Sequence, residues 1–81
     1  MITIDEAKSM LTHVQVLSAS SCEKLGDNYM LDKAYSKAYV CYEAGAGTDA
    51  DRAFGIGVHY RCKTKLDYAR ELYNDVMLFT K

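Results

Sequence analysis

Apolar and small side chains recur every three or four positions in the first third of the chain, which is the spacing of one face of an α-helix. This stretch runs from about residue 4 to residue 25, and its seam consists of Ile4, Ala7, Leu11, Val14, Ser18, Ser21 and Leu25. Because the steps alternate between three and four residues, we predict a single helix that packs along a neighbour. The small Ser18 and Ser21 would let another backbone approach its second half.

Two more stretches have helical spacing. From about residue 28 to 44, one side consists of Met30, Leu31, Ala34, Tyr35, Ala38, Cys41 and Tyr42. From about residue 49 to 79, the stripe is Phe54, Val58, Cys62, Leu66, Ala69, Leu72 or Tyr73, Val76 and Phe79. The first of these two is an amphipathic pattern of ordinary width. The three stretches together predict an all-α fold, a three-helix bundle with a long C-terminal helix.

Local chemistry predicts where the first two helices begin and end. Thr3 and Glu6 match a capping box, in which the Thr3 hydroxyl accepts from the Glu6 N–H and the Glu6 carboxylate accepts from the Thr3 N–H. Gly26 reads as a helix stop, because glycine is common just after the last helical residue. Asp27 follows directly as a candidate N-cap for the next helix.

The third stretch permits a second interpretation. Residues 54–62 alternate between apolar and other side chains and contain two glycines, which would suit a strand paired with residues 38–44. That pairing would give an α+β domain, helix–β-hairpin–helix. A second stop at residues 45–47, followed by Thr48 as an N-cap, favours the all-α fold.

Length and composition indicate one small domain, residues 1–81. Three cysteines, Cys22, Cys41 and Cys62, are an odd number for a disulfide framework, so we expect buried thiols in a reducing compartment. No apolar run has the length of a signal peptide or a membrane span. We therefore expect a cytoplasmic protein.

The net charge of −1 is unevenly distributed. Residues 1–50 carry four basic and seven acidic side chains, whereas residues 51–81 carry six basic and four acidic ones. The basic excess gathers in a tract that we predict to bind a partner: Tyr60, Arg61, Lys63, Lys65 and Arg70. We expect Arg61 and Lys65 to point to solvent and the partner to be a protein with an acidic surface. Nucleic acid is less favoured, because so few cations in a net-acidic chain make a poor phosphate track.

A second apolar strip lies opposite the main stripe of the third stretch. At about 100° per residue, Ala53, Ile56 and Tyr60 share that side. A helix that is apolar on two sides is buried on two sides. We predict that the strip mediates self-association into a homodimer; the alternative is burial inside an intrachain three-helix core.

Candidate chemistry is sparse. His59 and Cys62 are three residues apart and could both face a metal, but no CxxC or HxxxH spacing accompanies them. No acid–base or nucleophile constellation is apparent. The sequence therefore predicts no catalytic residues, no metal and no cofactor, and a protein that is not an enzyme.

The segment Lys33–Tyr39, together with Glu43, Gly47-Thr48 and Asp51-Arg52-Ala53, resembles small phage-encoded helical-hairpin accessory proteins. The resemblance implies a Tyr/Ala-rich helix that ends in a Gly-Thr turn before a second helix returns. It also implies action by binding a host or phage protein, in some cases against host defence. The combined prediction is stoichiometric binding of a macromolecular partner, as an inhibitor or adaptor. The alternatives are a nucleic-acid-binding regulator and a nucleotide-sequestering protein.

Overall fold

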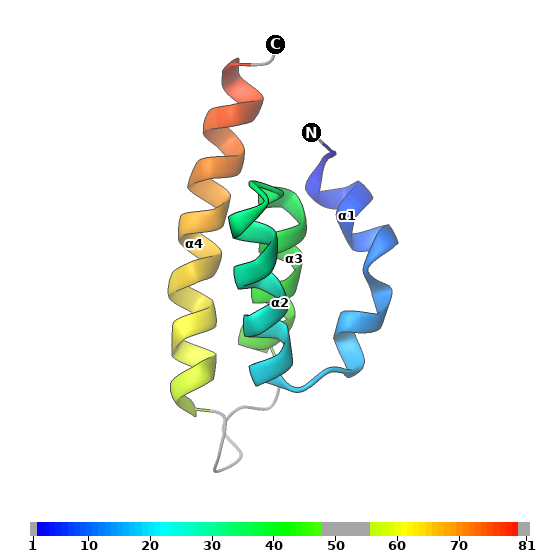
Figure 1. Ribbon diagram of the computed structural model, residues 1–81, viewed down its shortest axis with the longest axis vertical. Helices are drawn as coiled ribbons and strands as arrows, with labels where there is room; N and C mark the ends of the chain where they lie inside the picture. The colour runs from blue at the N-terminus through cyan, green and yellow to red at the C-terminus, as the bar shows by residue number, and fades with distance from the viewer. Residues whose placement is uncertain (1, 48–55, 80–81) are drawn as a thin grey trace.

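The computed structural model describes residues 2–47 and 56–79, apart from the side chain of Ile56, and this part of the chain is all-α without strands. The elements are α1 (Ile4–Met10), the 3₁₀ helix η1 (Thr12–Val16), α2 (Ala19–Leu31), α3 (Tyr35–Gly47) and α4 (Ile56–Phe79) (Figure 1). Helix α3 is central, with α1 on one side and α4 on the other, while α2 contacts both α3 and α4. The predicted helical class is confirmed, with one helix more than predicted.

The predicted capping box is confirmed at the start of α1. The Glu6 N–H donates to Thr3 Oγ1 at 3.1 Å, and the Thr3 N–H donates to Glu6 Oε1 at 2.9 Å. The prediction of a continuous helix from residue 4 to 25 is wrong, because the helix breaks after Met10. The chain passes through η1 and becomes extended at Ser18, whose hydroxyl accepts from the Ser21 N–H and caps α2.

The predicted stop at Gly26 and cap at Asp27 are wrong, because α2 continues through both residues. Gly26 is buried against the ring of Tyr42 in α3, where an added Cβ would lie 2.5 Å from Cε1 of that ring. The glycine therefore allows two helices to approach closely and does not end a helix.

The turn from α2 to α3 lies at residues 32–34. The Ala34 N–H donates to the Tyr29 carbonyl at 2.8 Å, and the Lys33 N–H donates to the Met30 carbonyl at 3.0 Å. These two bonds are those of a Schellman motif. Lys33 has φ of 60° and occupies the left-handed position where glycine is usual.

The core has two parts. One lies between α1, η1, α2 and α3 and contains Ala7, Leu11, Val14, Cys22, Val40, Cys41 and Ala44. The other lies mainly between α3 and α4 and contains Ala38, Tyr42, Cys62 and Ala69. Residues 38–44 and 56–62 are helical, so the hairpin alternative is wrong there. The predicted Thr48 cap and the start of the third helix at Asp49 lie outside the described residues.

Helix α4 has 24 residues, whereas α2 and α3 have 13 each. Its C-terminal turns extend beyond the other helices and account for much of the 44 Å length of the molecule (Figure 1). None of the helices in the described ranges combines the length and the apolar character needed to cross a membrane.

Candidate interaction site

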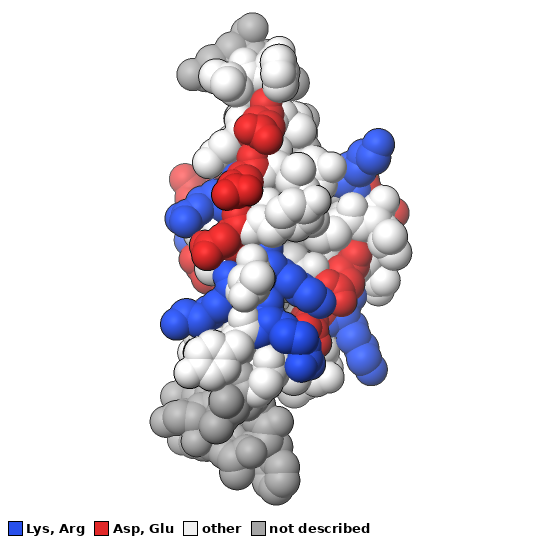
Figure 2. Space-filling model, turned by 90° about the vertical axis from the view of Figure 1, so that its left-hand side faces the viewer, with Lys and Arg blue, Asp and Glu red and all other residues white. Residues whose placement is uncertain are grey.

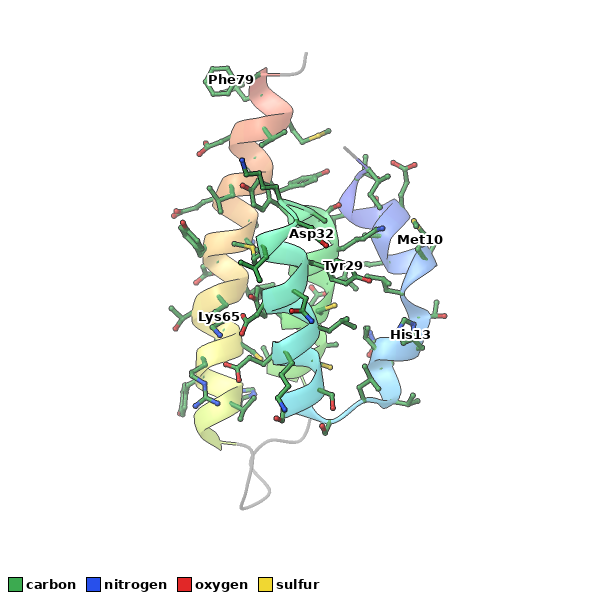
Figure 3. The ribbon with its side chains drawn as sticks, in the orientation of Figure 1. Met10, His13, Tyr29, Asp32, Lys65 and Phe79 are labelled. Atoms are coloured by element: carbon green, nitrogen blue, oxygen red, sulfur yellow. The ribbon has the colours of Figure 1, made fainter. Side chains whose placement is uncertain are left out.

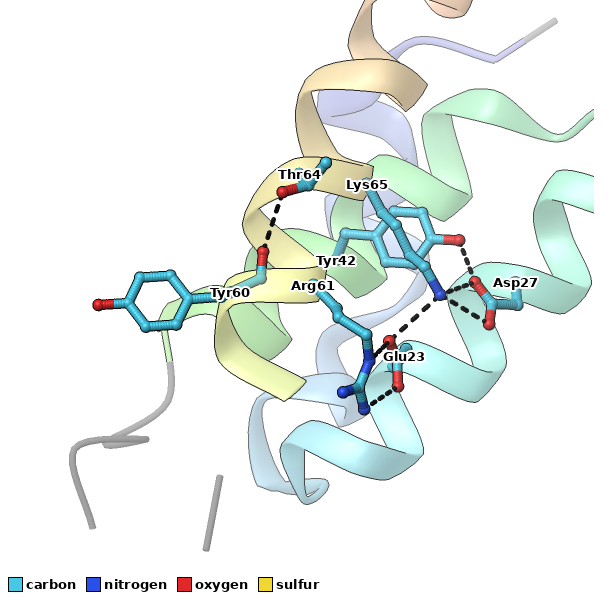
Figure 4. A network of polar contacts seen from close by, with 7 residues as sticks. All are labelled: Glu23, Asp27, Tyr42, Tyr60, Arg61, Thr64 and Lys65. Atoms are coloured by element: carbon cyan, nitrogen blue, oxygen red, sulfur yellow. Dashed lines mark hydrogen bonds and ion pairs between the residues drawn. The ribbon is translucent and has the colours of Figure 1, made fainter. Parts of the chain in front are cut away.

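A network of charged side chains connects α2 to α4 (Figure 4). Glu23 and Asp27 lie one turn apart on α2, and Arg61 and Lys65 lie one turn apart on α4. Arg61 donates to Glu23 through Nε at 2.7 Å and Nη2 at 3.1 Å. Lys65 Nζ donates to Glu23 Oε2 at 3.2 Å and to Asp27 Oδ1 at 3.0 Å. The two acidic side chains are thus matched by two basic ones.

Tyr42 attaches α3 to this network. Its hydroxyl donates to Asp27 Oδ1 at 2.5 Å, and Lys65 Nζ lies 6.0 Å from the centre of its ring. Burial, followed by the hydrogen bond to Asp27, raises the pKa of the Tyr42 hydroxyl. Tyr42 therefore remains a neutral donor, and the network holds three helices together.

The network also favours the charged forms of Glu23 and Lys65. The hydrogen bond from Arg61 holds the pKa of Glu23 below its usual value, against the opposing effect of desolvation. Desolvation also opposes the charge of Lys65, but hydrogen bonds to Asp27 and Glu23 raise its pKa overall. The expectation that Arg61 and Lys65 point to solvent is correct only in part: the Arg61 side chain is 55% exposed and that of Lys65 is 36% exposed, but both pair with carboxylates of α2.

The structure divides the predicted basic tract over two sides of α4. Arg61 and Lys65 face α2, whereas Lys63 lies about 160° around the helix from Arg61 and is exposed. Arg70 lies near the Lys63 side and approaches Asp67 at 3.5 Å. Tyr60 is 63% exposed and points away from the network (Figure 4). That these five residues bind a partner stays a prediction.

Two hollows adjoin the network, and Lys65 lines both of them. The first, of about 270 Å³, is lined by Tyr60, Arg61, Thr64 and Lys65. The second, of about 350 Å³, is lined by Asp27, Met30, Leu31, Tyr42, Lys65 and Tyr68. Leu31 is 82% exposed and Tyr68 is 57% exposed, so large apolar groups stand at the rim of the second hollow. We call the two hollows and their lining residues the α2–α4 face.

Sequence reasoning missed Glu23, Asp27, Leu31 and Tyr68 as parts of this site. A signal for the network was present, because an acidic pair four residues apart on one helix can match a basic pair four residues apart on another. Leu31 was instead assigned to the buried stripe of the second helix.

The predicted self-association strip is only partly visible. Ala53 lies outside the described residues, as does the side chain of Ile56. Tyr60 is exposed, and its ring meets His59 edge-on at 5.7 Å between centres. Self-association through this strip therefore stays a prediction.

The thiols and histidines form no metal site within residues 2–47 and 56–79, where no group of three His, Cys, Asp or Glu side chains could hold an ion. Cys22, Cys41 and Cys62 are all buried and reduced. Desolvation by burial raises the pKa of Cys41 to about 12 and that of Cys62 to about 11. Such thiols react poorly, because the thiolate is the nucleophile.

Comparison with known proteins gives no relative: no family model matches the chain, and no curated protein or solved structure matches it.

Proposed function

We propose that this protein acts by stoichiometric binding of a protein partner, as an inhibitor or adaptor, and that the α2–α4 face is the contact surface. The observation that carries the proposal is the grouping of Leu31, Tyr60 and Tyr68, all largely exposed, around two adjoining hollows. Exposed apolar groups that cluster within a polar rim are typical of interaction sites, and tyrosine is enriched there.

The rigidity of the face supports the same role. The hollows share Lys65, and that side chain is fixed by Glu23 and Asp27. A surface already held in one arrangement loses little conformational entropy when a partner binds. Tyr60 and Tyr68 are eight residues apart, about 12 Å along α4. A partner helix lying along α4 would fill both hollows with two apolar side chains about two turns apart.

The charges favour an apolar contact over binding to phosphates. Arg61 and Lys65 are already neutralised by acidic side chains of the same chain. Release of counterions from a nucleic acid requires cations that are free to pair with phosphates. The predicted acidic surface on the partner stays a prediction. The inhibitor form of this proposal agrees with the role that the resemblance to phage accessory proteins implies.

Site-specific photocrosslinking tests the proposal. A benzophenone amino acid is placed at Tyr68 in one variant and at Met10 on α1 in a control variant. The control is matched, because both side chains are 57% exposed in different parts of the surface. We expect Tyr68, and not Met10, to give a discrete protein adduct in lysate of the native cell, with and without nuclease. Excess unlabelled protein should compete, whereas a Leu31→Asp variant should compete poorly.

Equal adducts from both positions would refute the α2–α4 face as the contact surface. Adducts that disappear after nuclease would favour the nucleic-acid-binding alternative. A nucleotide that co-purifies with the protein, in the absence of any protein adduct, would favour the nucleotide-sequestering alternative.

A further inference from the structure

The C-terminal part of α4 carries an apolar stripe that continues past the helices that bury its first part. After Ala69, the apolar residues of α4 are Leu72, Tyr73, Val76, Met77, Leu78 and Phe79. The first four of these are half-buried and the last two are exposed, and neither core cluster of the described residues includes any of the six. At about 1.5 Å per residue, α4 is roughly 36 Å long and α2 and α3 are roughly 20 Å long. We call the part of α4 beyond Ala69 the projecting end.

The tip of the projecting end is exposed. Phe79 is 86% exposed and stands at the far end of the molecule (Figure 3). Helix α1 reaches only the base of the projecting end, where the Ile4 N–H donates to the Tyr73 hydroxyl at 3.3 Å. An amphipathic helix end that carries several large apolar groups is stable when another surface covers it.

A complementary surface lies on the same chain, next to the base of the projecting end. The turn between α2 and α3 borders a hollow of about 290 Å³, lined by Ile2, Asp32, Lys33, Ala34, Ser36 and Lys37. Asp32, at the end of α2, lies on the side from which α4 projects (Figure 3). The lining combines apolar groups with two lysines and one aspartate, so basic side chains outnumber acidic ones. We call this hollow the turn pocket.

The charge along α4 changes sign between its two halves. Residues 56–66 contain three basic side chains and no acidic one, whereas residues 67–79 contain three acidic side chains and one basic one. Figure 2 shows the acidic side chains along the upper half of this face and basic side chains gathered below them. The projecting end is therefore acidic, while Lys33 and Lys37 face the turn pocket.

We propose that a second copy of this chain covers the projecting end. Two chains pair about a two-fold axis, with their projecting ends side by side and antiparallel. The length of the projecting end is about the difference in length between α4 and α2. In an antiparallel pair, the tip of each α4 therefore lies beside the base of the other projecting end and reaches the turn pocket of that chain. Phe79 enters that pocket, and Asp75 lies near Lys33 and Lys37. Such an interface uses the same patch on both chains, as a two-fold dimer requires.

This interface differs from the predicted strip of Ala53, Ile56 and Tyr60, of which Ile56 and Tyr60 lie in the first turns of α4. Its residues are also different from those that line the α2–α4 face, so the two proposals can fail independently.

A charge-swap experiment with the full chain tests the proposal. Asp75→Lys in one variant and Lys33→Glu with Lys37→Glu in another each bring like charges together in their own homodimers. We expect each variant alone to dimerise at least tenfold more weakly than the wild type in sedimentation velocity. An equimolar mixture should form a heterodimer, because both of its contacts again pair opposite charges. Far-UV circular dichroism checks that each variant is folded.

A second pair of variants tests the apolar part of the contact. Phe79→Ser should dissociate the dimer. Leu78→Ser should leave the dimer intact, because Leu78 lies about 200° around the helix from Val76 and so faces away from the contact. It is a suitable control because it is exposed, as Phe79 is.

The proposal is overturned if the wild type is monomeric at 100 µM, or if the mixed charge variants do not pair. It is also overturned if Leu78→Ser acts as strongly as Phe79→Ser. A dimer that Tyr60→Ser dissociates and Phe79→Ser leaves intact would assign self-association to the strip predicted from the sequence.

Discussion

Replacing Gly45 by alanine is expected to destabilise the protein, although alanine is normally the better helix residue. Gly45 is buried in α3, and a Cβ there would lie 2.6 Å from Cys62 Sγ and 3.2 Å from Cys22 Cβ. Alanine gains about 1 kcal/mol of helix propensity over glycine. Overpacking a tight core costs about 1–3 kcal/mol. Because the nearest atom belongs to a buried side chain on another helix and would lie only 2.6 Å away, we expect a cost in the upper part of this range, about 2–3 kcal/mol. After the helix-propensity gain is subtracted, the free energy of unfolding should fall by about 1–2 kcal/mol.

The cause can be isolated by a second substitution. Cys62→Ala removes the sulfur that the new methyl group would meet, and alone it should cost on the order of 1 kcal/mol through a small cavity. In the double variant, the Gly45→Ala methyl occupies the space that the sulfur leaves. We therefore expect the double variant to be more stable than the sum of the single effects predicts, by about 1 kcal/mol or more.

The assay is urea unfolding followed by far-UV circular dichroism, in reducing buffer and at one protein concentration. Gly47→Ala is the matched control, because Gly47 lies in the same helix and, among the described residues, no atom beyond its chain neighbours and its own helix backbone lies within 4 Å of an added Cβ. That control should be neutral or slightly stabilising. The reasoning is refuted if Gly45→Ala is as stable as the wild type, or if the effects of Gly45→Ala and Cys62→Ala simply add.

Two further substitutions probe the charge network and the turn. The pKa of Glu23 is lowered in the folded protein, so its contribution to stability is complete above the ordinary carboxyl pKa and is lost as the pH falls through the lower folded value. Glu23→Gln should therefore be less stable than the wild type at pH 7, and the difference should shrink in urea unfolding as the pH falls below the ordinary carboxyl pKa of 4.5; a constant difference would contradict the argument. Lys33→Gly should raise the free energy of unfolding by about 0.5–1 kcal/mol, because a non-glycine residue in the left-handed region costs about 1–2 kcal/mol. Part of this gain is offset, because glycine loses more conformational entropy on folding. Lys24→Gly within α2 should instead lower stability by about 1 kcal/mol, and a loss of stability in both glycine variants would show that φ at Lys33 is not the cause.

The features that neighbouring residues determine could be predicted from the sequence. The Thr3–Glu6 box depends on two side chains within one turn, and it forms as predicted. The stripe of α4 also follows from local spacing, and its Cys62 and Ala69 are fully buried. Helical periodicity together with the local stop and cap signals was therefore enough to predict the all-α class.

The features that depend on distant contacts could not be predicted. Gly26 and Asp27 look like a stop and a cap, and only the Tyr42 ring across the helix interface explains why α2 continues through them. The real turn contains Lys33 in the left-handed region, without the glycine that would signal it. Since the site requires α2 beside α4, an error in the position of this turn also hid the match between the acidic and basic pairs.

The separate packing of the N-terminal segment has a consequence for the order in which the molecule opens. Helices α1 and η1 contact chiefly α3, and they join α2 through extended backbone at Leu17. They cover Cys22, whose thiol donates to the Val14 carbonyl at 3.4 Å, and Cys41 in the same cluster. Cys62 belongs to α4 and lies in the other cluster. Local openings expose the least supported segments first. Alkylation of Cys22 and Cys41 therefore reports the undocking of residues 2–17. Alkylation of Cys62 reports the separation of α4 from α3.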